Sequence, residues 1–270
     1  MLKFLKRRIL LCVVLSIISM SCTTVPITGR SQLNIIPSST MLSLSFQQYQ
    51  EFIGQNKLST DQAKTRMVKD VGKRIQNAVE TYFAMHNMSG KLADYHWEFN
   101  LVESKDINAW CMPGGKVVVY TGILPITKDE AGLAVVLGHE IAHAVAEHGN
   151  ERMSQSLIAQ MGGTALSAAI KEKPQETQQL WMTAFGLGAQ YGALLPFSRL
   201  QESEADHLGL IFMAMAGYNP NRAVTLWQTM ARESTGSKPP EFMSTHPSDA
   251  TRIKTLQALV PEAMKYYKNQ

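Results

Sequence analysis

The amino-acid sequence predicts a mainly helical α+β protein in which a small sheet packs on one buried helix. Three observations support this fold class. Apolar residues recur at helical spacing over most of the chain, and strand patterns are confined to residues 95–101, which alternate with period two, and 116–120, which are β-branched. The motif His139-Glu140-Ile141-Ala142-His143 lies in an apolar helical stretch soon after that region. An apolar fraction of 45% fits a globular domain with a substantial core.

Two amphipathic helices are predicted first, over residues 39–55 and 59–86. The second has apolar residues three or four positions apart, as expected for a helix with one buried face: Val68, Val71, Ile75 and Val79. Residues 95–101 then alternate between apolar and polar side chains, which indicates a half-buried strand with His96 on its solvated side. A Pro-Gly-Gly turn at 113–115 leads into a second strand over 116–120.

The helix that carries the His-Glu-x-x-His motif is expected to begin at a capping box formed by Thr127 and Glu130. Gly149 is a suitable stop, which places the last helical residue near His148. A later helix is predicted to open at the pair Ser198 and Gln201 and to close at Gly217.

Four further helical stretches complete the pattern. The apolar stretches 157–170 and 179–195 are interrupted by Gly and Gln, so we interpret them as buried or cleft-covering helices rather than membrane spans. The C-terminal part is again helical, over about 221–232 and 248–268.

The N-terminus predicts an address rather than a folded element. Residues 1–21 combine a basic start with an apolar run and no acidic residue, as in a secretory signal peptide, and Ser21-Cys22 resembles a bacterial lipobox. We expect Cys22 to be lipidated, residues 22–40 to form an extended tether and residues 41–270 to form a single domain. A plain cleaved signal or an uncleaved anchor is the alternative reading. Lipidation of Cys22 would leave Cys111 without a disulfide partner in the mature chain, and we interpret Cys111 as structural.

The net charge of +4 lies entirely in this N-terminal segment, at Lys3, Lys6, Arg7 and Arg8, and the rest of the chain carries equal numbers of basic and acidic residues. Because no basic run follows residue 8, we predict no binding to nucleic acid.

The motif His139-Glu140-x-x-His143 predicts a metal site. Two histidines four residues apart lie on one face of a helix, so both imidazoles can reach one ion. Glu140 is then placed beside the ion, where a general base can accept a proton from a water molecule.

Glu202 and Asp206 are also four residues apart, in a helical stretch with apolar flanks. Glu202 is the predicted third ligand, and Asp206 is predicted to accept a hydrogen bond from a ligand imidazole. Glu204 should point away from Glu202. A solvated acidic face is the alternative, but unpaired buried carboxylates are costly.

These motifs together resemble the M48 zinc metallopeptidases, in particular the Oma1-like branch and its periplasmic β-barrel assembly-enhancing relatives. The resemblance extends over most of residues 25–258, through 25–30, 108–116, 195–199 and 245–253. It implies a zincin-like fold and one zinc ion per subunit, with His139, His143 and Glu202 as ligands. Glu140 and Asp206 are the catalytic residues that it implies.

The resemblance also implies roles outside this set. The segment 108–120 resembles the family's edge strand, which receives a substrate peptide as an added strand through residues Asn108, Gly114, Gly115, Val117 and Val119. His246 corresponds to a histidine that can occupy the fourth zinc position in a latent state; a helix cap or a structural hydrogen bond is its alternative. Arg252 could stabilise an oxyanion or pair with an acidic residue.

The expected function is therefore that of a zinc endopeptidase of the bacterial cell envelope. It would face the periplasm, be attached to the membrane by its N-terminal lipid, with the outer membrane favoured over the inner one, and cleave unfolded or misassembled polypeptides. Its partners would include the outer-membrane assembly machinery. The alternative is a chaperone-like assembly factor that holds outer-membrane proteins in the same cleft.

Overall fold

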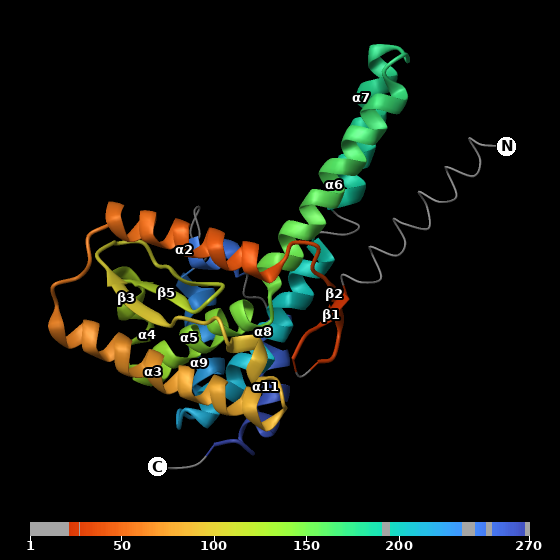
Figure 1. Ribbon diagram of the computed structural model, residues 1–270. Coiled ribbons are helices and arrows are strands. Elements are labelled where there is room, and N and C mark those ends of the chain that lie inside the picture. Colours follow the sequence, from red (N-terminus) through yellow and green to blue (C-terminus); the bar gives the residue numbers. More distant parts are fainter. Residues whose placement is uncertain (1–21, 27, 191–194, 234–240, 247–249, 268–270) are drawn as a thin grey trace. The chain divides into compact units, whose positions relative to one another are not determined.

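The computed structural model describes residues 22–26, 28–190, 195–233, 241–246 and 250–267 (Figure 1). The chain forms two compact units. The first, here called the hairpin unit, contains the chain up to Met41 together with Glu147–Leu200. The second, here called the sheet unit, contains Leu42–Ala146 and Gln201–Gln270. The predicted fold class, a mainly helical α+β protein with a small sheet, is confirmed.

The sheet unit is built around three strands in the order β3-β5-β4: β3 (Glu98–Val102), β5 (Lys116–Tyr120) and β4 (Ala109–Met112). The central strand β5 runs parallel to β3 and antiparallel to β4. Gly114 and Gly115 connect β4 to β5 with φ of 84° and 80°, a left-handed conformation that favours glycine. The predicted second strand and the glycine turn are thus present, whereas the first strand begins at Glu98 and not at residue 95.

Helices cover both faces of this sheet. Helix α2 (Ser38–Gln55) packs on one face, where Tyr49 contacts Val118, with Trp110 and Tyr120 beside them. Helices α3 (Gln62–Met85) and α5 (Glu130–Val145) lie on the other face, as Figure 1 shows. The predicted stripe on α3 is fully buried. Short turns η1 (Ser89–Leu92), η2 (Thr121–Ile123) and α4 (Leu124–Thr127) complete the connections.

Helix α5 differs from its prediction at both ends. Its N-cap is Asp129, whose side chain accepts a hydrogen bond from the Gly132 N–H at 2.7 Å, because Thr127 is used as the last residue of α4. The helix ends at Val145, and Glu147 adopts a left-handed conformation with φ of 59°. Gly149 is not a stop; it lies inside the next helix, α6 (His148–Ile170).

Helix α8 (Leu195–Met215) begins three residues before Ser198, and Gly217 ends it with φ of 81°. Its crossing with α5 is unusually close, since a Cβ atom on Gly209 would lie 2.9 Å from the backbone nitrogen of His139. A Cβ atom on Gly138 would likewise lie 2.9 Å from the Gly209 carbonyl oxygen. Two glycines therefore let these backbones approach, and this approach brings the two predicted metal-binding segments together.

The remaining helices of the sheet unit are α9 (Asn221–Glu233), α10 (Glu241–Thr245) and α11 (Ala250–Ala263). Helix α9 packs against α5 and α11 and contributes the buried Trp227.

The hairpin unit contains a two-stranded ribbon of β1 (Cys22–Thr24) and β2 (Ser31–Leu33), followed later in the chain by the antiparallel helices α6 and α7 (Gln175–Ala189) (Figure 1). Residues 157–170 and 179–195 were predicted to form buried or cleft-covering helices. Burial is wrong, because most of their described side chains are exposed, and the cleft-covering role stays a prediction. None of the described helices combines the length and the apolarity needed to cross a bilayer.

Candidate metal centre

Helix α5 presents the two predicted histidine ligands side by side. The Nε2 atoms of His139 and His143 lie 3.1 Å apart, and both side chains are buried. This follows from their separation of four residues, about one helical turn. Both imidazoles therefore face one point in the interior of the sheet unit.

Helix α8 brings the predicted carboxylate ligand to the same point. Glu202 Oε2 lies 3.3 Å from His139 Nε2, and Glu202 Oε1 lies 3.2 Å from His143 Nε2. Burial opposes ionisation of Glu202, but the surrounding imidazoles of His139, His143 and His246 hold the pKa of its carboxyl well below the usual range.

His246 joins this cluster directly after helix α10. Its Nδ1 lies 2.9 Å from Glu202 Oε2 and 3.1 Å from His139 Nε2. One ligand atom from each of four buried residues, His139, His143, Glu202 and His246, lies within 4.8 Å of the others. Three imidazole nitrogens and one carboxylate oxygen are donors that zinc prefers, so this set fits a zinc ion.

Asp206 occupies the position expected for a residue that orients a ligand. Its Oδ1 lies 3.0 Å from Nδ1 of His139, opposite the nitrogen that faces the cluster. Burial lowers the pKa of His139, but hydrogen bonds to Asp206 and Glu202 outweigh it and raise that pKa to about 9. An acceptor at Nδ1 fixes the ring so that Nε2 is presented to the metal.

Arg252, from α11, pairs with Asp206. Its Nε and Nη2 lie 2.8 Å and 2.7 Å from the two oxygens of Asp206, and its Nη1 lies 3.2 Å from Glu202 Oε2. Although burial raises the pKa of Asp206, the Arg252 charge and the bond to His139 lower it below its ordinary value. Of the two roles open from sequence, this geometry gives the ion pair. An oxyanion would compete with two carboxylates for the same guanidinium.

The ring of Trp227 packs against the guanidinium of Arg252 in this pair. The sequence did not predict that Trp227 lies at the site. The guanidinium carbon of Arg252 lies 3.5 Å from the centre of the Trp227 ring, and the His139 ring lies 5.6 Å from that ring. The sequence offered one signal, an amphipathic pattern in α9, but that pattern predicts only a core residue.

Glu140 is buried beside the cluster but outside the four-residue ligand set. Its Oε1 lies 3.4 Å from Nε2 of His246. Burial, and to a lesser degree the charge of Glu140, raises the pKa of the Cys111 thiol well above its ordinary value. Cys111 on β4 is therefore a protonated thiol near Glu140, in agreement with a structural role.

Of the two strands in the segment predicted to bind a substrate strand, only β4 lies at an edge of the sheet. Val117 and Val119 lie in β5, which is paired on both sides, so their backbone groups cannot accept another strand. Gly114 and Gly115 form the turn, and Asn108 directly precedes β4, its carbonyl accepting from the Tyr120 N–H at 3.1 Å. Within the described residues no strand pairs with the outer edge of β4.

Other acidic residues and histidines of the described chain lie outside the four-residue ligand set. Glu204 is buried, so it is not part of a solvated face. His207 pairs with Glu262 at 3.0 Å, and His86 contacts the Tyr82 carbonyl at 2.7 Å. His96 is exposed, as predicted, but it precedes β3 and does not lie in the strand.

A buried helix carries the His-Glu-x-x-His motif, a second helix supplies a carboxylate, and a small sheet with β4 at its edge belongs to the same unit. This combination defines a zinc metallopeptidase. The model of peptidase family M48 matches residues 70–260, and the chain belongs to this family. The predicted zinc cofactor and the metalloendopeptidase class agree with this membership.

Similar proteins include mitochondrial and bacterial peptidases. The chain is 36% identical over 243 residues to the mitochondrial metalloendopeptidase OMA1 of Schizosaccharomyces pombe, with 88% of this chain and 66% of the relative covered. It is 32% identical over 250 residues to the human mitochondrial metalloendopeptidase OMA1, covering 89% of this chain and 46% of that protein. With the β-barrel assembly-enhancing protease of Escherichia coli it shares 24% identity over 240 residues, 86% of this chain and 46% of the relative. The chain thus spans about half to two thirds of the length of these relatives.

Proposed function

We propose that the protein is a zinc-dependent endopeptidase of the bacterial cell envelope that cleaves unfolded or misassembled polypeptides. The observation that carries this proposal is the position of Glu140, which lies beside a buried four-donor set while remaining outside it. A carboxylate in that position is suited to proton transfer and not to metal binding.

The residues divide the chemistry between them. His139, His143 and Glu202 would hold the zinc ion, which polarises a carbonyl group and acidifies water when bound. Glu140 accepts the proton of the attacking water and passes it to the leaving amine of the scissile bond. Asp206 keeps Nδ1 of His139 occupied, so the imidazole cannot rotate away from the metal.

The outer edge of β4 is the proposed substrate-binding strand. Asn108, Trp110 and Met112 direct their backbone groups toward β5, so those of Ala109 and Cys111 are directed to the outer edge. There the Ala109 N–H donates to Asn108 Oδ1 at 2.9 Å, a bond that a substrate strand would replace. An extended peptide could pair there mainly through its main chain, and Cys111 lies close to Glu140. Main-chain hydrogen bonds do not depend on the side chains of the substrate. This mode of binding therefore favours unfolded segments and requires no defined sequence.

His246 supports a latent state of this enzyme. It contributes the fourth donor, and a catalytic zinc site needs that position open for water and substrate. His246 would have to move away from the zinc position before cleavage could begin.

The proposed location rests on the N-terminal sequence. A signal peptide over 1–21 followed by a lipidated Cys22 would attach the protein to the envelope, facing the periplasm, with the outer membrane favoured. Its similarity to β-barrel assembly-enhancing proteases makes the outer-membrane assembly machinery the proposed partner.

The Glu140→Gln variant tests the proposed activity. We expect it to abolish cleavage of unfolded casein while the content of bound zinc, measured by elemental analysis, stays at one ion per chain. The matched control is Glu147→Gln, a carboxylate just beyond α5 that bonds Asn34 at 2.7 Å. Retained cleavage in Glu140→Gln would exclude the proposed base. Casein that is bound but never cleaved by the wild type would favour the chaperone alternative.

A further inference from the structure

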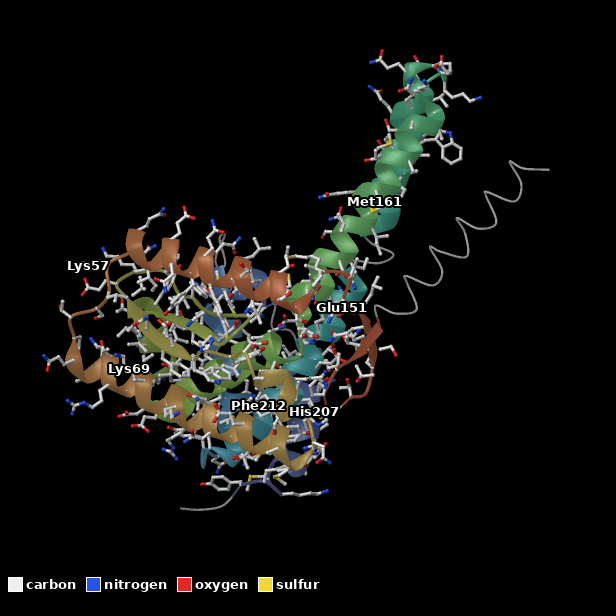
Figure 2. The ribbon with its side chains drawn as sticks, viewed as in Figure 1. Lys57, Lys69, Glu151, Met161, His207 and Phe212 are labelled. Atoms are coloured by element: carbon white, nitrogen blue, oxygen red, sulfur yellow. The ribbon has the colours of Figure 1, made fainter. Side chains whose placement is uncertain are left out.

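The helical hairpin of α6 and α7 exposes an apolar surface that the peptidase site does not use. Seven of the twelve large apolar side chains that are exposed in the described chain lie on this hairpin: Met153, Leu157, Ile158, Met161, Leu180, Trp181 and Met182. Figure 2 shows Met161 on the outside of α6. A concentration of exposed apolar side chains on one element is typical of a site of interaction.

The hairpin also lacks charge on every side. Residues 153–170 and 177–190 contain no Asp, Glu, Lys or Arg, although most of their described positions are exposed. An exposed helix in water ordinarily carries charges opposite its apolar stripe. The polar residues here are Ser, Thr and Gln, so neither helix has the charged face of a water-facing helix.

Charged residues return at the two ends. At the base, Glu151 binds Arg30 through two contacts of 2.7 Å and 2.8 Å. At the turn between the helices stand two lysines and two glutamates, Lys171, Lys173, Glu172 and Glu176. These charges balance, so the hairpin has no electrostatic preference for an acidic or a basic partner.

The contact between the two helices resembles that of helices in lipid. A Cβ atom on Gly162 would lie 3.0 Å from the Phe185 ring, and one on Gly163 would lie 3.5 Å from it. In lipid the hydrophobic effect does not drive helices together. Small residues at the interface let the helices approach closely, so that packing contacts hold them together.

The base of the hairpin is fixed to the part of the chain that follows the N-terminal apolar run. Beside the Arg30–Glu151 pair, the Ile35 N–H donates to Ser154 Oγ at 3.0 Å, and Asn150 donates to the Ile36 carbonyl at 2.8 Å. The ribbon that begins at Cys22 and the hairpin therefore belong to one unit. Any membrane attachment at Cys22 places this hairpin near the same bilayer.

We propose that the α6–α7 hairpin inserts into the surface of a lipid bilayer, as a second contact beside the N-terminal anchor. The anchor is part of the proposed function, whereas the absence of charge and the exposed apolar side chains are independent of it. Because Thr and Gln recur along both helices and charged residues stand at their turn, the insertion is into the interface, with apolar side chains below the head groups. Trp181, 55% exposed, is suited to that depth.

Trp181 provides the measurement. Of the four tryptophans Trp181 alone is exposed. Its fluorescence emission is obtained by subtracting the spectrum of Trp181→Phe from that of the wild type. The full-length protein is reconstituted into vesicles of phosphatidylcholine and phosphatidylglycerol, with and without bromine on the acyl chains. We expect the Trp181 emission to lose most of its intensity in brominated vesicles, and more when bromine lies near the head group than near the methyl end.

Leu157→Glu places a charge on the neighbouring helix and should restore most of that intensity. Met85→Glu is the matched control, since Met85 is 63% exposed but lies on α3 in the sheet unit, and it should leave the quenching unchanged. Circular dichroism verifies that each variant is folded. Equal emission in both kinds of vesicle would overturn the proposal. Emission that changes only with protein density would also overturn it and assign the hairpin to a second copy of the chain. Failure of casein cleavage leaves this result unaffected.

Discussion

Arg252 connects three groups at the metal centre that come from two other helices. Its guanidinium reaches both oxygens of Asp206 and one of Glu202, and it stacks on Trp227. A planar fork with several donors can make these contacts together, whereas a lysine ammonium cannot. Arg252 therefore holds the carboxylates of Asp206 and Glu202 in place, and Asp206 in turn fixes the ring of His139.

Replacement of Arg252 by Lys should lower the proteolytic rate by about 10–100-fold, the usual range for residues that orient metal ligands. The effect should appear in kcat and in zinc affinity, with little change in KM, because the β4 edge is untouched. Steady-state kinetics and zinc titration measure these quantities. Arg222→Lys is the control, since Arg222 forms an exposed pair with Asp129 at 3.4 Å. A change in KM alone would contradict the positioning role.

His246→Ala should raise the basal rate of casein cleavage severalfold, because removal of the fourth donor opens the zinc position to water. The rate per bound zinc ion is the quantity to compare. His207→Ala serves as control, because His207 pairs with Glu262 away from the centre. An unchanged or lower rate would show that His246 is not an inhibitory ligand.

At the scale of elements, the crossing of α5 and α8 controls the site. Gly138 and Gly209 bring the helix backbones into contact, and this contact sets the position of Glu202 relative to His139. Gly209→Ala should destabilise the protein by about 1–3 kcal/mol through overpacking and lower zinc affinity at the same time. Thermal unfolding and zinc titration test this. Gly149→Ala is the matched control, since a Cβ atom there meets nothing within 4 Å and the residue is helical. Loss of stability with unchanged zinc affinity would separate the crossing from the site.

The sequence predicted elements well where one local signal decides them. The stripe on α3 and the spacing of His139 and His143 follow from helical periodicity alone. The end of α5 was mispredicted because Glu147 adopts a left-handed conformation that glycine usually takes, so Gly149 gave a misleading signal. The exposure of α6 and α7 could not be predicted from composition, since buried and exposed helices can contain the same apolar residues.

At the scale of the whole molecule, the metal centre joins segments far apart in the sequence. His139 and His143 come from α5, Glu202 and Asp206 from α8, Arg252 from α11 and His246 from the segment after α10. Local spacing identified His139 with His143 and Glu202 with Asp206, and the family resemblance indicated His246 and Arg252. The involvement of Trp227 depends on long-range packing that no local pattern contains. Without a metal, the sheet unit buries several ionisable groups against one another, which is costly unless each is paired.

Zinc should therefore stabilise the folded sheet unit strongly. A ligand present at about 1,000 times its Kd stabilises the native state by about 4 kcal/mol. For a domain of this size that corresponds to a rise in Tm of about 8–16 °C, since each kcal/mol shifts Tm by about 2–4 °C. Differential scanning calorimetry of the chelated protein, before and after addition of zinc, measures the shift. The His143→Ala variant should show a much smaller rise, because it lacks one ligand. An equal rise in that variant would mean that zinc acts elsewhere on the chain, since the cluster would then be dispensable for the stabilising ion.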